Sequence, residues 1–100
     1  VAALERVMTK APDPALSRIA GLRLARVLLD QGDLDRAGAI AASHANDDSF
    51  GGDFAAIQGD IAARQGRHAE ARQAYERAMG AGASLPQLIQ LKLDNLPAAG

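Results

Sequence analysis

A 34-residue offset within the sequence constrains the fold more strongly than any other feature of the chain. At this offset a glycine that follows glutamine and two small residues recur: Gly32 with Gly66, Ala25 with Gly59, and Ala37 with Ala71. Self-similarity at a fixed period of roughly 20–50 residues is the signature of a chain that stacks copies of one supersecondary unit. The sequence therefore predicts a repeat protein in which two copies of the unit are visible.

Each copy of the unit is predicted to be a hairpin of two helices joined at the glycine. Ahead of Gly32, apolar residues recur at helical spacing, among them Leu24 and Leu28. Asp33 follows this glycine, and an acidic side chain is a favoured N-cap for the next helix. The small residues shared by the two copies let the paired helices approach closely. The pattern indicates an all-α fold.

Thirty-four residues is the period of the tetratricopeptide repeat, and Tyr75 lies where that repeat places a large ring. We therefore expect a right-handed, tetratricopeptide-like array of two hairpins, at about 16–45 and 50–80. Helices at about 2–10 and 85–96 are expected to cap the two ends, because each hairpin needs a neighbour to bury its open face.

A generic alanine-rich helical bundle is the alternative to the repeat array. Gly21 and Ala55 stand at the positions where a large aromatic residue usually begins each repeat. Hydrophobic residues form 48% of the chain but only three of them are aromatic, so either fold must build its core from Ala, Leu, Ile and Val. The agreement of period, glycine and small positions favours the repeat array.

Charge and composition exclude several classes of function. The net charge is −1 with no basic block, which disfavours nucleic acid as a partner, and the absence of cysteine removes disulfides and thiol chemistry. The acids around Gly32 lack the spacing of a calcium loop, and His44 and His68 have no partners at metal-ligand spacing. We identify no catalytic, metal or cofactor-binding residue, and we expect a protein that is not an enzyme.

The expected functional surface is the inner face formed by the first helix of each hairpin and the last helix. Both charge signs are present there, which suits protein binding, although a solvated face of no function would look the same. Arg26 and Asp60 occupy equivalent positions and are expected to pair across the groove. An exposed apolar stripe within 88–96 is a second candidate surface. The predicted groove residues are Leu22, Arg23, Arg26, Asp30, Asp60, Arg64, Gln87, Gln90 and Asp94.

Three segments resemble one known family more specifically. They are LRLARVLLDQGDLDRA (22–37), GDIAARQGRHAEARQAYERAM (59–79) and LIQLKLDNL (88–96). Together they resemble the YfgM family, the ancillary subunit of the SecYEG translocon. The second block followed at close range by the third is the more specific part of this resemblance.

The resemblance implies that residues 1–100 are a single domain and a fragment of a longer, membrane-anchored protein. It implies a single-pass protein of the bacterial inner membrane, with this domain in the periplasm and with membrane contact only through an N-terminal anchor outside this sequence. The implied partners are the SecYEG translocon and a membrane-anchored periplasmic chaperone of the peptidyl-prolyl isomerase type, linked by the adaptor during protein export. The alternative is a tetratricopeptide scaffold subunit of another bacterial complex.

Overall fold

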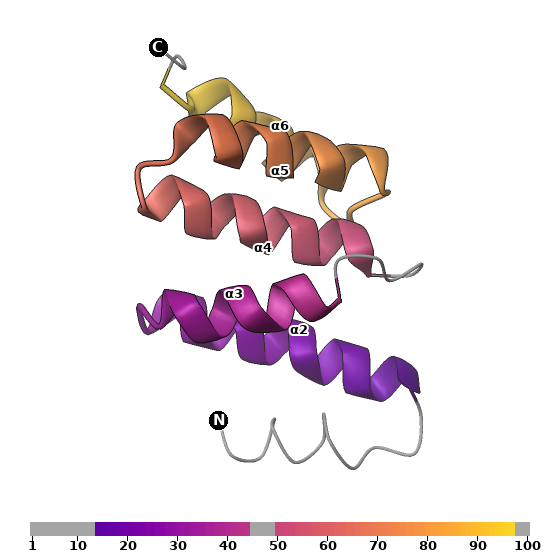
Figure 1. Ribbon diagram of the computed structural model, residues 1–100. Helices are drawn as coiled ribbons and strands as arrows, with labels where there is room; N and C mark the ends of the chain where they lie inside the picture. The colour runs from indigo at the N-terminus through magenta and orange to yellow at the C-terminus, as the bar shows by residue number, and fades with distance from the viewer. Residues whose placement is uncertain (1–13, 45–49, 98–100) are drawn as a thin grey trace.

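The computed structural model describes residues 14–44 and 50–97, which form five helices and no strand (Figure 1). The helix predicted at about 2–10 lies outside these residues. None of the described helices has the length and apolar content that crossing a bilayer requires. The all-α class predicted from the sequence is confirmed. The helices are α2 (Pro14–Asp30), α3 (Leu34–Ser43), α4 (Gly51–Arg64), α5 (His68–Gly80) and α6 (Pro86–Asn95).

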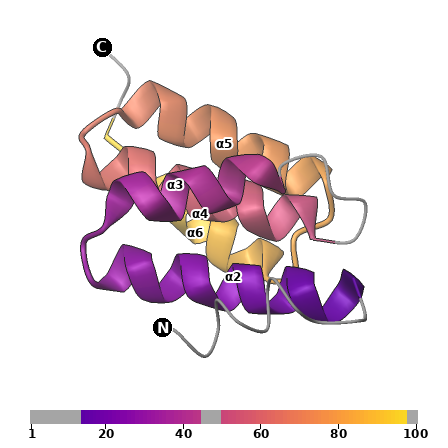
Figure 2. The same ribbon diagram turned by 60° about the horizontal axis from the view of Figure 1, so that its bottom comes forward.

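The helices pair as two hairpins, α2 with α3 and α4 with α5, and Figure 2 shows α3 running alongside α2. Gly32 and Gly66 occupy the two turns with φ of 84° and 75°. The amide after each glycine closes the preceding helix in the same way: Asp33 N–H donates to Leu28 O and Arg67 N–H to Ala62 O, both at 2.8 Å. This is the Schellman pattern, which requires a left-handed residue at the glycine position. The predicted role of both glycines is therefore confirmed.

The first turn of α4 packs closely against the end of α5 and the segment after it. Gly51 and Gly52 lie inside the helix and are buried. A Cβ at Gly52 would stand 2.8 Å from the backbone nitrogen of Ala83 and 3.0 Å from the carbonyl oxygen of Ala78. The glycine is there because backbone meets backbone at this point, which no larger residue would permit.

The core consists of two clusters that share α4. One face of α4 supplies Phe54, Ile57 and Ile61 to a cluster with α2 and α3. Another face supplies Ala55, Ala56 and Ala62 to a cluster that contains Tyr75 of α5 and Ile89 and Leu93 of α6. Both core clusters therefore bury their apolar side chains against α4.

The Tyr75 ring explains why one of the small repeat positions, Gly59, is a glycine. A Cβ at this position would lie 2.5 Å from the Tyr75 ring. The glycine therefore makes room for an aromatic side chain, rather than for the close backbone approach that the sequence alone predicted. Ala25, Ala37 and Ala71 are fully buried in the two clusters.

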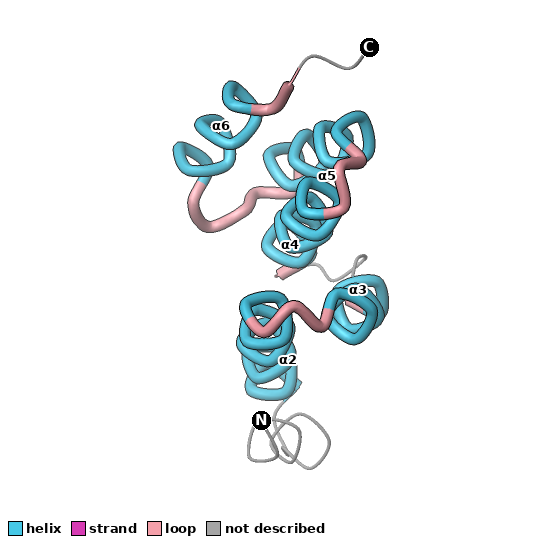
Figure 3. The backbone as a smooth tube through the Cα atoms, turned by 90° about the vertical axis from the view of Figure 1, so that its left-hand side faces the viewer, coloured by secondary structure: helices cyan, strands magenta, loops and turns pink. Residues whose placement is uncertain are grey.

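The helices form two layers, with α2, α4 and α6 on one side and α3 and α5 on the other (Figure 3). The first layer contains the first helix of each hairpin. The last helix follows the second hairpin in the place where a third hairpin would begin. The inner face predicted from the sequence is thus lined by α2, α4 and α6.

Candidate functional site

The inner face contains a hollow of about 540 Å³, which we call the leucine groove. Most of its wall is apolar, and its volume lies in the range of about 300–1,000 Å³ that is usual for binding pockets. Leu85 and Leu88 of its α6 wall remain 62% and 44% exposed. The lining residues are Leu22, Arg23, Arg26, Val27, Asp53, Ala56, Ser84, Leu85, Leu88, Ile89 and Lys92.

A second hollow of about 470 Å³ continues the same face toward the glycine turns, and we call it the polar hollow. Arg26 and Lys92 line both hollows and so mark the boundary between them. The other residues of the polar hollow are Leu29, Asp30, Asp60, Ala63, Arg64, Tyr75, Leu91, Asn95 and Leu96.

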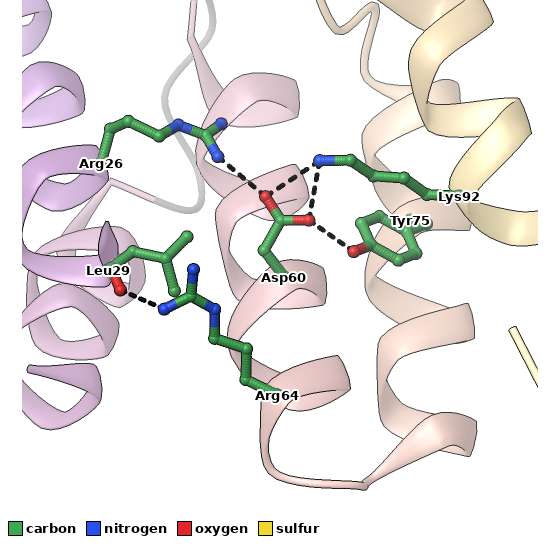
Figure 4. A network of polar contacts seen from close by, with 6 residues as sticks. All are labelled: Arg26, Leu29, Asp60, Arg64, Tyr75 and Lys92. Carbon is green, nitrogen blue, oxygen red and sulfur yellow. Dashed lines mark hydrogen bonds and ion pairs between the residues drawn. The ribbon is translucent and has the colours of Figure 1, made fainter. Parts of the chain in front are cut away.

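Asp60 of α4 stands at this boundary and binds side chains from three other helices (Figure 4). Arg26 of α2 donates from Nη1 to Oδ2 at 2.9 Å, which confirms the pairing predicted across the groove. Lys92 of α6 donates from Nζ to Oδ1 at 2.9 Å and to Oδ2 at 3.1 Å. The Tyr75 hydroxyl of α5 donates to Oδ1 at 2.5 Å. We call these four residues the Asp60 network.

The pKa values of Asp60 and Tyr75 keep the carboxyl ionised and the hydroxyl protonated near neutral pH. Burial alone would raise the pKa of Asp60, whose side chain is only 12% exposed. Hydrogen bonds from Tyr75, Lys92 and Arg26, with the charge of Lys92, outweigh burial and hold the pKa of Asp60 below its usual value. Burial and the neighbouring Asp60 carboxylate raise the pKa of Tyr75, so its hydroxyl remains a donor.

The Asp60 network holds four helices at one point, so it positions the groove. The carboxylate is mostly buried, and removal of a partner from a buried charge is more costly than the net value of the pair. Lys92 Nζ also lies 6.0 Å from the centre of the Tyr75 ring, within range of a cation–π contact. The network thus fixes how α6 sits on the second hairpin.

Arg64 is a second link between the hairpins in the polar hollow. Its Nη1 donates to the carbonyl oxygen of Leu29 in the last turn of α2. The same oxygen also accepts the Gly32 amide at 3.0 Å. A cation in this place complements the dipole at the C-terminal end of α2. Asp30, predicted to face the groove, lines the same hollow and is exposed.

Ser84 and Asp53 close the opposite end of the leucine groove. Asp53 Oδ1 accepts the Ser84 amide at 2.9 Å, and Oδ2 accepts the Ser84 hydroxyl at 2.7 Å. Asp53 is not among the groove residues predicted from the sequence, because nothing local to it signals a partner that lies 31 residues away in the chain. Both carboxylate oxygens are thereby engaged within the protein.

The prediction for α6 was wrong for Gln87, Gln90 and Asp94. Gln90 and Asp94 line a separate hollow against α5, where Gln90 Nε2 donates to Asp94 Oδ1 at 2.9 Å. Gln87 is exposed and lines neither the leucine groove nor the polar hollow.

The rotation of α6 about its axis explains this error. Ile89 and Leu93 are buried against α4 and α5, and this turns Leu88 and Lys92 toward α2. Positions 90 and 94 come two residues after 88 and 92, about 200° further around the helix. The leucine pair at 85 and 88 is the sequence signal that could have identified the correct face of α6. These leucines line the same hollow as Arg23 and Arg26, so the apolar stripe and the charged groove, predicted as two candidate surfaces, meet in one surface.

The described residues contain no group of three or more His, Cys, Asp or Glu side chains able to hold a metal ion. His44 stacks on the buried Phe54 ring, with centroids 4.6 Å apart and planes 18° apart.

Comparisons with known proteins agree with this architecture. The model of the tetratricopeptide repeat-like domain family matches residues 1–98. The chain is 32% identical over 94 residues to a protein of Haemophilus influenzae named ancillary SecYEG translocon subunit, covering 93% of this chain and 46% of that protein. It is 35% identical over 95 residues to a protein of the same name from Aggregatibacter actinomycetemcomitans, covering 94% and 46%.

The chain thus spans about half the length of the curated relatives it matches. No solved structure gives a significant match. The resemblance to ancillary translocon subunits inferred from the three segments is confirmed at the level of these homologues. From the family match, the hairpin pair and the shared glycine turns together, the chain belongs to the family of tetratricopeptide repeat-like domains.

Proposed function

We propose that this domain is a non-catalytic adaptor that binds other proteins through its inner face at the SecYEG translocon. The observation that carries the proposal is the leucine groove, in which Leu85 and Leu88 stay exposed beside a hollow of about 540 Å³. Exposed apolar surface collected in a concave site is typical of a docking surface. The domain family and the printed names of the two relatives support a protein-interaction role.

The finer part of the proposal concerns partners and location. We propose that the domain links SecYEG to a membrane-anchored periplasmic chaperone of the peptidyl-prolyl isomerase type during protein export. We also propose that it lies in the periplasm, held at the inner membrane by a single N-terminal span of the full-length protein. The resemblance of 22–37, 59–79 and 88–96 to the YfgM family supports both statements.

Site-specific photo-crosslinking in bacterial inner membranes tests this proposal. A photoreactive residue replaces Leu88 in the groove of the full-length protein, and the matched control replaces Glu76, which lines the hollow on the opposite side of α6. We expect crosslinks from position 88 to a SecYEG subunit or to the chaperone, identified by mass spectrometry, and few from position 76.

Two results would contradict the proposal. Equal crosslinking from both positions would remove the groove as the interface. Crosslinks from position 88 exclusively to subunits of an unrelated bacterial complex would favour the alternative, a tetratricopeptide scaffold of that complex.

A further inference from the structure

The described residues that line the leucine groove include three cationic side chains and one acidic side chain, Asp53. Arg23 and Arg26 lie one turn apart on α2 and both line the groove. Arg23 is exposed and has no hydrogen-bond or ion-pair partner among the described residues. In the same part of the chain, Arg26 engages a carboxylate through Nη1 alone, which leaves its other guanidinium N–H groups available.

Asp53, which lines the leucine groove, and Asp60, which pairs with Arg26, are already engaged within the protein. Asp53 gives both of its oxygens to Ser84, and Asp60 gives both to the Arg26, Lys92 and Tyr75 side chains. Neither can turn toward Arg23 without losing these contacts. The groove therefore presents unused cationic donors and no comparable unused anionic acceptor.

The apolar wall lies directly beside these donors. Leu22 and Val27 on α2, Ala56 on α4, and Leu85 and Leu88 on α6 line the same hollow as Arg23. A ligand that fills the groove would place aliphatic side chains against this wall, and a neighbouring carboxylate would then lie within reach of the guanidinium groups. Planar guanidinium groups bind carboxylates in a bidentate geometry that lysine cannot match.

We propose that the groove binds a short protein segment in which leucine-like side chains stand beside an acidic residue, with Arg23 and Arg26 receiving the carboxylate. This inference rests on the proposed protein-binding function and specifies its ligand. The Asp60 network ends the apolar part of the groove, so the segment lies across α2, α4 and the start of α6 and stops at Arg26 and Lys92. Charge complementarity selects the acidic segment over a basic one.

Fluorescence anisotropy with the full chain tests this specificity. The probe is a short fluorescein-labelled peptide of leucine and glutamate, compared with peptides in which glutamine or lysine replaces each glutamate. We expect the glutamate peptide to bind about threefold to tenfold more tightly than the glutamine peptide, since charge-assisted hydrogen bonds are about twice as strong as neutral ones. The lysine peptide is expected to bind most weakly.

Variants of the chain locate the effect. Arg23→Gln should reduce affinity for the glutamate peptide to about that of the glutamine peptide, and Leu88→Ala should weaken both peptides. Arg72→Gln is the matched control, because Arg72 lies on α5 and lines the hollow behind α6 instead of the leucine groove. It should leave both affinities unchanged. Circular dichroism of each variant confirms that it is folded.

Several results would overturn the inference. Equal affinity for the glutamate and glutamine peptides, preference for the lysine peptide, or equal losses in Arg23→Gln and Arg72→Gln would each exclude the proposed ligand. Binding of anionic phospholipid vesicles that depends on Arg23, without binding of any peptide, would assign the arginine pair to a lipid headgroup instead. Crosslinking of SecYEG from position 88 without glutamate preference would leave the proposed function intact and reject this specificity alone.

Discussion

The leucine groove and the polar hollow lie on the same helices of one face, yet they use their charges in opposite ways. In the polar hollow, Asp60 and Arg64 are engaged with other helices of the chain. In the leucine groove, Arg23 has no partner in the described part of the chain and two leucines remain exposed. Asp60 and Arg64, two charged residues predicted to line the groove, therefore make structural contacts, whereas the leucine groove keeps an arginine without a partner among the described residues beside exposed leucines.

Among the substitutions that distinguish the two hollows, loss of the Asp60 carboxylate should lower the free energy of unfolding most. Asp60→Ala leaves Lys92 and Arg26 without their acid, and their side chains are only 31% and 47% exposed. We expect a destabilisation of about 2–4 kcal/mol, somewhat below the range for fully buried pairs because these cations retain some solvent. Urea denaturation followed by circular dichroism measures it. Asp94→Ala, at an exposed acid on the opposite face of α6, should change stability by less than about 0.5 kcal/mol.

Overpacking at Gly59 is expected to have the next largest effect. Gly59→Ala places a methyl group 2.5 Å from the Tyr75 ring and displaces the hydroxyl that donates to Asp60. We expect a loss of about 1–3 kcal/mol in unfolding free energy. Gly38→Ala is the control, because its methyl group would meet only Ile61 Cδ1 at 3.8 Å. That variant should match or exceed wild-type stability, as alanine is the better helix former. Similar losses in both variants would contradict the role of Gly59.

Low pH should reduce the stability that the Asp60 network contributes. The folded pKa of this carboxyl lies below its usual value, so its contribution to stability is complete above the unfolded-state pKa and is lost as pH falls through the folded pKa. Between neutral pH and the acid limb, wild type should therefore lose more stability than Asp60→Asn, which has no carboxyl to protonate. Urea denaturation of both proteins at a series of pH values measures this. The free energies of unfolding of wild type and Asp60→Asn should converge at low pH. Curves that remain parallel would mean that Asp60 contributes little.

The leucine groove should respond to substitution with little change in stability. Leu88→Ala removes a side chain that is 44% exposed, and we expect a shift of about 0.5 kcal/mol or less. Ile89→Ala, one residue further along α6, removes a side chain only 4% exposed and should cost about 2–4 kcal/mol. Thermal melts of the two variants would distinguish the wall of the groove from the core behind it.

The repeat arrangement could be predicted from the sequence because its determinants are local or periodic. Gly32 and Gly66 mark turns that need a positive φ, and the Arg26–Asp60 pairing follows from equivalent positions in two copies of one unit. No such rule applies to α6, where a helix of 10 residues can rotate about its axis until its best apolar face is buried. Ile89 and Leu93 set that rotation, and they turned Gln90 and Asp94 away from the groove.

Two further features depend on contacts between distant segments. Asp53 binds Ser84, and Gly52 packs against the backbone of Ala83, so the start of α4 is defined by the connection that leads into α6. In the sequence, the same residues look like an acidic, glycine-rich linker. The role of Lys92 as the third donor around Asp60 also becomes visible only when α6 is placed.

Replacement of Arg23 and of Arg26 by glutamine, one turn apart on α2, tests the distinction between the leucine groove and the polar hollow most directly. For Arg23→Gln we predict unfolding within about 0.5 kcal/mol of wild type, together with weakened binding of the leucine–glutamate peptide. For Arg26→Gln we predict a stability loss of about 1 kcal/mol, because the variant breaks the pair with Asp60 at an arginine that is partly exposed. Equal stability losses in the two variants, or unchanged peptide binding in Arg23→Gln, would contradict the account.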